Sequence, residues 1–488
     1  MASVDQVISS VPKQLLIGGE WRDAEGGKTL DVTNPATGEV LCAIADASVA
    51  DGAAALDAAV AAQASWAKTA PRDRSEMLRA AFELLVERTE EFALLMTLEM
   101  GKPLAEARGE VAYGAEFFRW FAEEAVRVHG RYAVAPNGLT RLVTMQQPVG
   151  PVFAITPWNF PLAMGTRKIG PAIAAGCTSV VKPAHETPLT MLALAGLLQE
   201  VGVPAGVVNV VTTSTSSAVS GPIINDPRLR KLTFTGSTAV GKKLVEQSAS
   251  QLLRLSMELG GNAPFIVFED ADLDAAADGA IAAKYRNSGQ TCVCANRFFV
   301  HEKVYDAFAA KLAERVRALA VGPGTEPGVA QGPLINAEAV AKVEEHIADA
   351  TARGASIAAG GRRHSLGGTF FEPTVLTRVT PDAKIFREET FGPVAPLIAF
   401  SGEAEVIELA NRSEYGLASY FYARDLGRVW RVAEALEYGM VGVNTGLITT
   451  EVAPFGGVKQ SGLGREGSMY GIDEYVEVKY VAFGGLDR

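Results

Sequence analysis

The chain has 488 residues, enough for about three domains with large cores. Its 48% hydrophobic and 21% charged residues are typical of a globular protein, and its net charge of −11 argues against a basic surface that binds nucleic acid. Four cysteines in so long a chain exclude a disulfide scaffold and indicate a reducing compartment, so we expect a cytoplasmic protein.

The first 150 residues predict strands followed by long helices. Residues 1–12 lack the basic and apolar regions of a signal peptide, and no run of about 18 apolar residues predicts a membrane span. Residues 14–45 alternate apolar runs with Gly and Asn-Pro turns, which is a strand pattern. Apolar residues at helical spacing predict helices over 53–68, 74–100 and 104–128, and a hairpin follows over 131–147.

From Val149 onward, short apolar runs alternate with helical stretches. Strands are expected at 152–155, 179–181, 206–212 and 231–235, and helices at 168–176, 188–201 and 237–248. A second series of the same kind runs from about residue 264 to 443. This alternation is typical of α/β proteins with parallel, doubly wound sheets. Residues 472–483 alternate as a final strand, and we expect its free edge to pair with another subunit.

The stretch from residue 287 to 297 contains Cys292, the candidate nucleophile. It follows a predicted helix over 272–284 and precedes an apolar strand at 298–300. Cysteine acts as its thiolate, which cations and backbone N–H groups stabilise, and Arg286 and Arg297 are the nearest cations in sequence. From this stretch alone, Cys292 and Cys294 could equally be inert packing residues.

Two segments after predicted strands are candidates for binding phosphate or ribose. Gly236 and Ser237 open a helix, where a helix N-terminus attracts an anion, although a plain N-cap by Ser237 would also explain them. The spacing matches neither the G-x-G-x-x-G pattern nor a P-loop. Lys182 follows a strand at the edge where doubly wound folds bind ligands, unless it is a solvated loop lysine.

Three further segments carry polar groups suited to catalysis or ribose binding. Glu258 lies between apolar residues, where burial makes a carboxylate usable as a general base near neutral pH, although a surface Glu is the alternative. Asn159 lies in a turn rich in Pro and aromatic residues that is either an oxyanion donor site or merely rigid. Glu389 and Phe391 would project to one face of an extended segment. Histidine and cysteine spacings predict no metal site.

Taken together, six segments resemble the aldehyde dehydrogenase superfamily. They occur in family order, and the likeness spans roughly residues 15–485: Trp158-Asn159-Phe160-Pro161, Lys182-Pro183-Ala184, Phe234-Thr235-Gly236-Ser237, Glu258-Leu259-Gly260-Gly261, Gly289-Gln290-Thr291-Cys292 and Glu389-Thr390-Phe391-Gly392-Pro393. Residues 163–168, 285–287, 292–294 and 454–462 are most similar to the branch of the family that oxidises succinic semialdehyde.

The resemblance implies an α/β fold with two doubly wound domains and a small β arm. The cofactor domain is expected over residues 1–125 and 148–257, and the catalytic domain over 258–445. An oligomerisation arm is expected over 126–147 together with 470–488. Such an arm implies a homodimer or a homotetramer.

The same resemblance assigns catalytic roles to three residues. Cys292 would be the nucleophile, Asn159 the oxyanion donor and Glu258 the base that activates water. The thiolate would form a thiohemiacetal, which becomes a thioester when hydride passes to the nicotinamide. Water would then hydrolyse the thioester. A non-catalytic nucleotide-binding protein on the same fold is the alternative from a different class.

The implied substrate is a small aldehyde with a distal carboxylate, namely succinic semialdehyde. Arg167 and Arg286 would bind the carboxylate through paired hydrogen bonds, with Thr450 nearby and Thr449 adjacent to it. Either arginine could instead be a structural ion-pair partner. Glutarate semialdehyde or an aliphatic aldehyde is the alternative substrate.

The implied cofactor is NADP or NAD, and NADP is favoured. The residues expected to bind it are Ile155, Thr156, Trp158, Lys182, His185, Gly236, Ser237, Glu389 and Phe391. Many relatives have Glu where this chain has His185, and a carboxylate there would repel the 2′-phosphate of NADP. Cys294 resembles the partner of a reversible disulfide that blocks the nucleophile in relatives, although the spacing is near the upper limit for a disulfide and a spectator role is the alternative.

Overall fold

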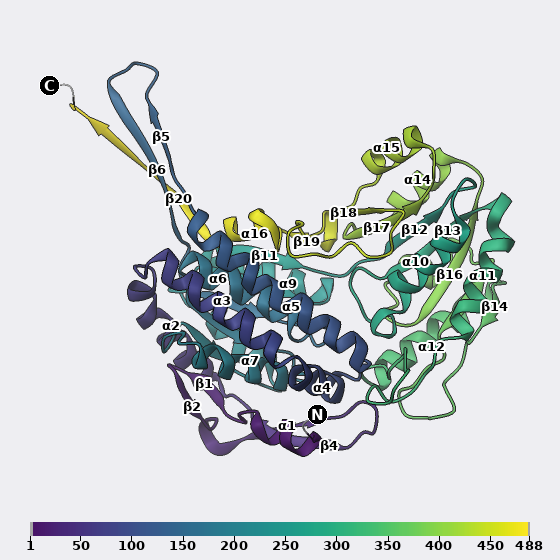
Figure 1. The fold of residues 1–488 in the computed structure, drawn as a ribbon, viewed down its shortest axis with the longest axis horizontal. Coiled ribbons are helices and arrows are strands. Elements are labelled where there is room, and N and C mark those ends of the chain that lie inside the picture. Colours follow the sequence, from purple (N-terminus) through teal and green to yellow (C-terminus); the bar gives the residue numbers. More distant parts are fainter. Residues whose placement is uncertain (1–2, 487–488) are drawn as a thin grey trace.

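The structure, a computed structural model, describes residues 3–486 (Figure 1). Residues 1, 2, 487 and 488, which the expected domain ranges include, lie outside this part. Two sheets form the two halves of the molecule, and a narrow sheet projects from the first half (Figure 1). The expected α/β class, with two doubly wound sheets and a small β arm, is confirmed.

The first sheet has a parallel core of five strands, β7 to β11, and antiparallel strands at both edges. In sheet order its strands are β19 (Gly462–Leu463), β11 (Arg254–Glu258), β10 (Lys231–Thr235), β7 (Val152–Ile155), β8 (Ser179–Lys182), β9 (Val208–Val210), β1 (Leu15–Ile17) and β2 (Glu20–Arg22). The register pairs Ile155 with Lys182 and Thr235 with Glu258. The carboxyl ends of these strands are therefore aligned along one edge of the sheet.

Helices cover both faces of the first sheet because alternate strand residues point to opposite sides. In β7, Val152 and Ala154 pack in one apolar cluster, whereas Phe153 and Ile155 pack in another. The helices of this half are α1 (Val4–Ser10), α2 (Val49–Trp66), α3 (Pro71–Glu87), α4 (Thr89–Met100), α5 (Leu104–Glu124), α6 (Ala163–Ala175), α7 (Leu189–Glu200), α8 (Ser216–Asn225) and α9 (Thr238–Ser248). A two-stranded sheet, β3 (Thr29–Thr33) with β4 (Val40–Ala45), lies beside them.

Two of these helices differ from the sequence-based expectation. The single helix predicted over 74–100 is two helices, because Arg88 leaves helical geometry with φ −93° and ψ 22°. Helix α8 was not predicted, since its Ser, Gly and Pro residues have low helix propensity.

The second sheet repeats the pattern with seven strands, of which only β14 runs antiparallel among those described. In sheet order the strands are β14 (Ser356–Ala359), β15 (Thr374–Thr377), β16 (Val394–Phe400), β13 (Ala295–His301), β12 (Ala263–Val267), β17 (Ala418–Tyr422) and β18 (Met440–Val443). One face packs on α10 (Leu273–Tyr285) and α11 (Tyr305–Arg317). The other packs on α12 (Ala337–Ala352), α13 (Lys384–Arg387), α14 (Glu403–Asn411) and α15 (Leu426–Ala435).

The chain passes between the sheets through short segments. Residues 259–262 are the whole connection from β11 to β12. After β18 the chain returns to add β19 to the edge of the first sheet, and α16 (Ser468–Asp473) follows. Within residues 3–486, no helix combines the length and the apolar character needed to span a membrane.

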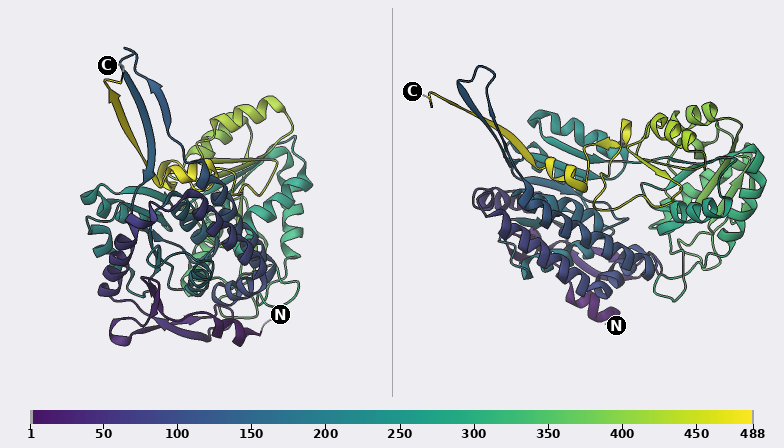
Figure 2. Two further views of the ribbon diagram at one scale, coloured as in Figure 1. Left: turned by 60° about the vertical axis from the view of Figure 1, so that its left-hand side comes forward. Right: turned by 45° about the horizontal axis from the view of Figure 1, so that its top comes forward.

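The projecting sheet is the predicted arm. Its strands are β5 (Arg131–Val134), β6 (Thr140–Pro148) and β20 (Val476–Gly484), and β20 pairs antiparallel with β6 along its whole length. The yellow C-terminal strand therefore lies beside the blue hairpin and extends away from the body in each view (Figures 1 and 2). Three of its large apolar side chains, Tyr132, Val478 and Tyr480, are 66%, 67% and 58% exposed. Pairing of β20 with another subunit remains a prediction.

Candidate active site

Three of the residues singled out from sequence, Asn159, Glu258 and Cys292, line one cavity of about 280 Å³. Asn159 lies in the loop after β7, and Glu258 is the last residue of β11 in the first sheet. Cys292 comes from the second half of the molecule, in the loop between α10 and β13. Both halves are therefore needed to form the cavity.

The loop that carries Cys292 is tightly constrained. Asn287 and Ser288 adopt left-handed conformations with φ of 53° and 54°, which is costly for residues other than glycine. Gly289 follows with φ 75°, and a side chain there would lie 2.2 Å from the carbonyl oxygen of Gly392. The Asn287 amide donates to the carbonyl oxygen of Asn159 at 3.0 Å, so the loop is fixed against the opposite side of the cavity.

The Cys292 thiol lies in an environment that favours its protonated form. Burial raises its pKa to about 12, and Arg167 opposes this shift while Glu258 and Glu389 add to it. The expectation that Arg297 lies close enough to stabilise the Cys292 thiolate is wrong. Its buried guanidinium donates to main-chain carbonyls, including those of Asn262 and Ala410, and not toward Cys292.

Glu258 is buried and only partly satisfied. Its Oε2 atom has no hydrogen-bond partner among the described residues. Burial raises its pKa well above the ordinary value, and the nearby Glu466 carboxylate adds to the shift while Arg167 and Lys168 oppose it. A carboxyl group with a raised pKa and a free oxygen in a cavity is a candidate to exchange a proton with a bound molecule.

The amide of Asn159 keeps donor capacity toward the cavity. Its Nδ2 donates to the carbonyl oxygen of Gln290 at 3.0 Å, which uses one of its two N–H groups. The other N–H can therefore bind an oxyanion formed beside Cys292.

A second cavity, of about 460 Å³, continues the first. Both are lined by Pro157, Trp158, Thr235, Gly236 and Ser237. Of the residues expected to bind the cofactor, Ile155, Thr156, Trp158, Lys182, His185, Gly236 and Ser237 line this second cavity. The aligned carboxyl ends of β7, β8 and β10 form this groove, where doubly wound sheets usually bind ligands.

The groove fits a nicotinamide dinucleotide. Three buried hydroxyl groups in its lining, Thr156 Oγ1, Ser220 Oγ and Thr235 Oγ1, have no hydrogen-bond partner among residues 3–486. An unsatisfied buried hydroxyl is unfavourable, so these groups indicate a polar ligand. Lys182 donates to Ser216 Oγ at 3.1 Å, and burial lowers its pKa to about 8. Ser237 also caps α9 by accepting from Val240 N, as the alternative interpretation expected.

Glu389 and Phe391 line the catalytic cavity, although their backbone differs from the extended segment expected. Phe391 is left-handed with φ 53°. Its ring packs nearly perpendicular to the Trp158 ring, with 5.5 Å between the ring centroids. Glu389 Oε1 accepts from Gly261 N at 3.1 Å, and burial raises its pKa to about 7. Sequence reasoning missed Lys342 of α12, which lines the same cavity but belongs to no recognisable motif.

The two arginines expected to bind the substrate lie in different environments. Arg167 is buried and forms an ion pair with Glu466 at 2.9 Å, as the structural alternative expected. The Arg286 guanidinium lies 5.2 Å from the Phe160 ring, and Phe160 lines the catalytic cavity. Arg286 and Thr449 line a different, very small cavity, whereas the Thr450 hydroxyl donates to Glu451 at 2.9 Å.

Cys294 is the last residue of the loop that carries Cys292. It is buried, and its thiol donates to the carbonyl oxygen of Lys284 at 3.1 Å. A disulfide with Cys292 would therefore require the Cys294 thiol to leave this partner.

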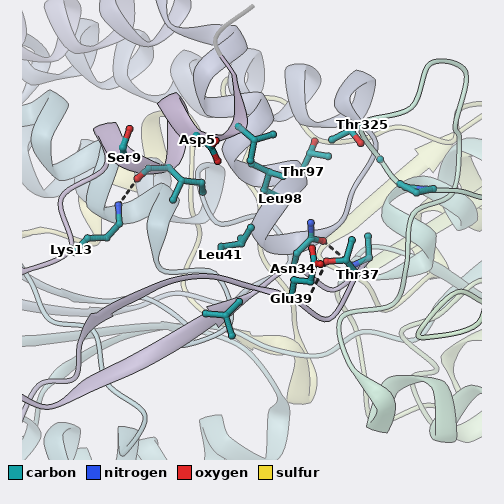
Figure 3. Close-up of a pocket in the computed structure, with 16 residues that line it drawn as sticks. Asp5, Ser9, Lys13, Asn34, Thr37, Glu39, Leu41, Thr97, Leu98 and Thr325 are labelled. Atoms are coloured by element: carbon teal, nitrogen blue, oxygen red, sulfur yellow. Dashed lines mark hydrogen bonds between the residues drawn. The ribbon is translucent and has the colours of Figure 1, made fainter.

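A larger cavity, of about 740 Å³, lies elsewhere, between α1, the turn from β3 to β4, the end of α4 and residues 323–325 (Figure 3). In it Lys13 donates to main-chain carbonyls of Ile8 and Val11. None of the residues with expected catalytic or cofactor roles lines it. The smaller cavity that contains Cys292 is therefore the candidate active site.

Comparison with known proteins points to one family. The model described as "Aldehyde dehydrogenase family" matches residues 21–481. A glutarate-semialdehyde dehydrogenase of Pseudomonas aeruginosa is 55% identical over 474 residues, which cover 97% of this chain and 98% of the relative. An Escherichia coli protein named as an NADP(+) succinate-semialdehyde dehydrogenase is 56% identical, with 97% and 98% covered. The crystal structure of succinate-semialdehyde dehydrogenase from Burkholderia pseudomallei is 58% identical, has a TM-score of 0.97, and matches over 98% of this chain and 99% of that one.

The raised pKa of Cys292 predicts how its reactivity depends on pH. Because the folded protein favours the thiol up to a pKa of about 12, the reactive thiolate is a small fraction at neutral pH. In protein without cofactor, alkylation of Cys292 by iodoacetamide should accelerate by about tenfold per pH unit between pH 7 and pH 9. Mass spectrometry of the Cys292 peptide measures the rate, and Cys292→Ser identifies that peptide. A plateau below pH 8 would contradict the prediction.

Proposed function

Because the chain belongs to the aldehyde dehydrogenase family, we propose that it oxidises succinic semialdehyde to succinate with NADP or NAD, and that NADP is preferred. The observation that carries this proposal is the shared cavity of Asn159, Glu258 and Cys292, which continues into a groove lined by unpartnered hydroxyl groups. A non-catalytic nucleotide-binding protein would have no use for these three groups in one cavity.

The chemistry begins at Cys292. Its proton leaves to solvent, so that Glu258 stays a carboxylate, and the thiolate sulfur bonds to the aldehyde carbon. The aldehyde oxygen becomes an oxyanion, which the free N–H of Asn159 Nδ2 stabilises. As the C=O bond re-forms, a hydride leaves the former aldehyde carbon and the acyl group stays on sulfur as a thioester; the groove lined by Lys182 and Ser237 would hold the nicotinamide cofactor that supplies the hydride acceptor.

Glu258 then completes the cycle. Its carboxylate takes a proton from a water molecule, whose oxygen attacks the thioester carbon. The C–S bond breaks, the carboxylic acid leaves, and Cys292 regains the thiolate. The high pKa of Glu258 suits this role, because the carboxylate holds the proton it has removed.

Arg286 is the proposed anchor for the distal carboxylate. Arg167 already pairs with Glu466, whereas the Arg286 guanidinium lies 5.2 Å from the ring of Phe160, and Phe160 lines the catalytic cavity. Relatives carry names for both succinate and glutarate semialdehydes. The two substrates differ by one methylene group, which is worth only about 1–3 kcal/mol in a pocket, so glutarate semialdehyde is the second candidate.

The preference for NADP rests on position 185. His185 is half exposed at the groove and forms a contact with Glu186 at 3.3 Å. An imidazole adds no negative charge of its own, whereas a carboxylate at that position would repel a 2′-phosphate. Lys182 and Ser216 supply a cation and a hydroxyl in the same groove.

The arm is the proposed assembly element of a homodimer or homotetramer. The side chains of Tyr132, Val478 and Tyr480 are exposed on it. Exposed apolar side chains grouped in this way are typical of a surface that contacts another protein. We also propose that the enzyme works in the cytoplasm, since its four cysteines are free thiols.

Replacing the anchor tests the substrate. Arg286→Ala should raise the KM for succinic semialdehyde by roughly tenfold or more, because a bidentate charge-assisted contact is lost. The KM for propanal, which has no carboxylate, should change less than about threefold. Steady-state kinetics on both aldehydes measure this difference. An unchanged KM for succinic semialdehyde would refute the assignment of Arg286.

Introducing a carboxylate at position 185 tests the cofactor preference. His185→Glu should lower kcat/KM for NADP relative to NAD at least roughly fivefold, since two charges about 4 Å apart repel by about 1 kcal/mol even in water. His185→Gln is the matched neutral control and should keep the wild-type ratio. A wild-type enzyme with a strong preference for NAD would contradict the proposal.

Charging the arm tests the assembly. Val478→Asp combined with Tyr480→Asp places two carboxylates on one face of β20, where burial against a partner would be unfavourable. Sedimentation velocity should show a smaller particle than the wild type. Lys479→Gln, on the opposite face, is the control and should leave the mass unchanged. Equal masses for all three proteins would argue against assembly through this face.

A further inference from the structure

Residues 102–110 contact both the segment that carries Asn159 and the loop that carries Cys292. Glu106 and Glu110 lie one turn apart on α5, and Lys102 precedes the first turn with the same four-residue spacing. Lys102 and Glu110 are buried, and none of the three residues lines the catalytic cavity or the cofactor groove. Their contacts are therefore with the protein that surrounds the reacting groups.

Lys102 and Glu110 fix the segment that carries Asn159. Lys102 Nζ donates to the carbonyl oxygen of Asn159 at 2.8 Å and also pairs with Glu110 Oε2. The other oxygen of Glu110 accepts from the main-chain N–H groups of Leu162 and Ala163 at 3.0 and 3.2 Å. The ion pair therefore holds both ends of the turn from residue 159 to 163.

Glu106 fixes the loop that carries Cys292. Its Oε2 accepts from the main-chain N–H of Asn287 at 2.7 Å, at the first of the two left-handed residues. Asn287 in turn donates from its side chain to the carbonyl oxygen of Asn159. One stretch of chain thus determines where the oxyanion donor and the nucleophile stand relative to each other.

Stability alone is a weak reason to keep these charges. Replacing a buried ion pair by well-packed neutral side chains is often neutral or stabilising. A charge-assisted network holds its partners in one geometry, and displacement of a reacting group by about 1 Å costs roughly a hundredfold in rate.

We propose that Lys102, Glu106 and Glu110 are positioning residues that set the placement of the Asn159 amide against Cys292. This inference rests on the proposed oxyanion role of Asn159. It does not depend on the distal carboxylate of the substrate, so propanal tests it as well as succinic semialdehyde.

The test is a double-mutant cycle. Lys102→Met combined with Glu110→Gln removes the bond to the Asn159 carbonyl, neutralises both partners of the ion pair, and keeps an acceptor for Leu162 and Ala163. With Asn159 present, kcat/KM for propanal should fall roughly tenfold to a hundredfold. Asn159→Ala alone should cost about 10²–10³ in kcat. In the Asn159→Ala background, the pair of substitutions should cost less than about threefold more, because the residue through which they act is gone.

One control variant and two measurements separate a positioning role from an effect on folding. Glu99→Gln changes another buried carboxylate, which accepts from Leu189 and Thr190 at the start of α7, and should lower the melting temperature while kcat/KM stays within about twofold. Thermal unfolding reports whether each variant keeps its fold, and the alkylation rate reports whether the reactivity of the Cys292 thiol is unchanged. If the Lys102 and Glu110 variant does not fold, the same cycle with Glu106→Ala decides, since Glu106 is only partly buried.

Additive losses in the cycle would overturn the inference, as would an unchanged kcat/KM when Lys102→Met and Glu110→Gln are introduced with Asn159 present. Either result can arise in an enzyme that oxidises aldehydes normally, so it leaves the proposed function intact. A wild-type protein that oxidises succinic semialdehyde no better than propanal would contradict the proposed substrate and leave the positioning role standing.

Discussion

Close packing of main chain at Gly261 is the contact on which the active site depends. A side chain at this position would lie 2.4 Å from the carbonyl oxygen of Cys292, and one at Gly260 would lie 3.0 Å from Glu389 Oε2. Two consecutive residues without side chains therefore let the two halves of the molecule approach until Glu258 of β11 and Cys292 of the second half share one cavity. Ser461 holds this crossing, since its hydroxyl donates to the Gly260 carbonyl at 2.7 Å.

Burial at this junction determines the protonation of the reacting groups. The same removal of water that raises the pKa of Cys292 and Glu258 strengthens every charge-assisted bond around them. The charges that the site retains are paired: Lys102 with Glu110 on one side, and Arg167 with Glu466 on the other. Cys292 and Glu258, whose pKa values are both raised by burial, thus lie near ion pairs that hold the surrounding segments.

Residues at the ends of parallel strands could be located from sequence, whereas partners distant along the chain could not. Lys182 and Glu258 end strands whose register aligns them, so the alternation of strands and helices was enough to bring them to one edge. Glu466 accepts from Lys168, which is 298 residues earlier in the chain, and Lys102 donates to Asn159, which is 57 residues later. No local sequence pattern indicates such contacts. Arg297 was misjudged because closeness to Cys292 in sequence does not fix which face of β13 its side chain occupies.

The return of the chain from β18 to β19 has a consequence for protein engineering. The first sheet is complete only after the polypeptide has built the second, and β11 then pairs with β19 more than 200 positions later. Neither half is a continuous cassette that could be cut out and grafted onto a homologue. A functional chimera would have to exchange the crossing at residues 259–262 and the returning segment around Ser461 as a matched set, so recombination between homologues should succeed only when both junctions come from the same parent.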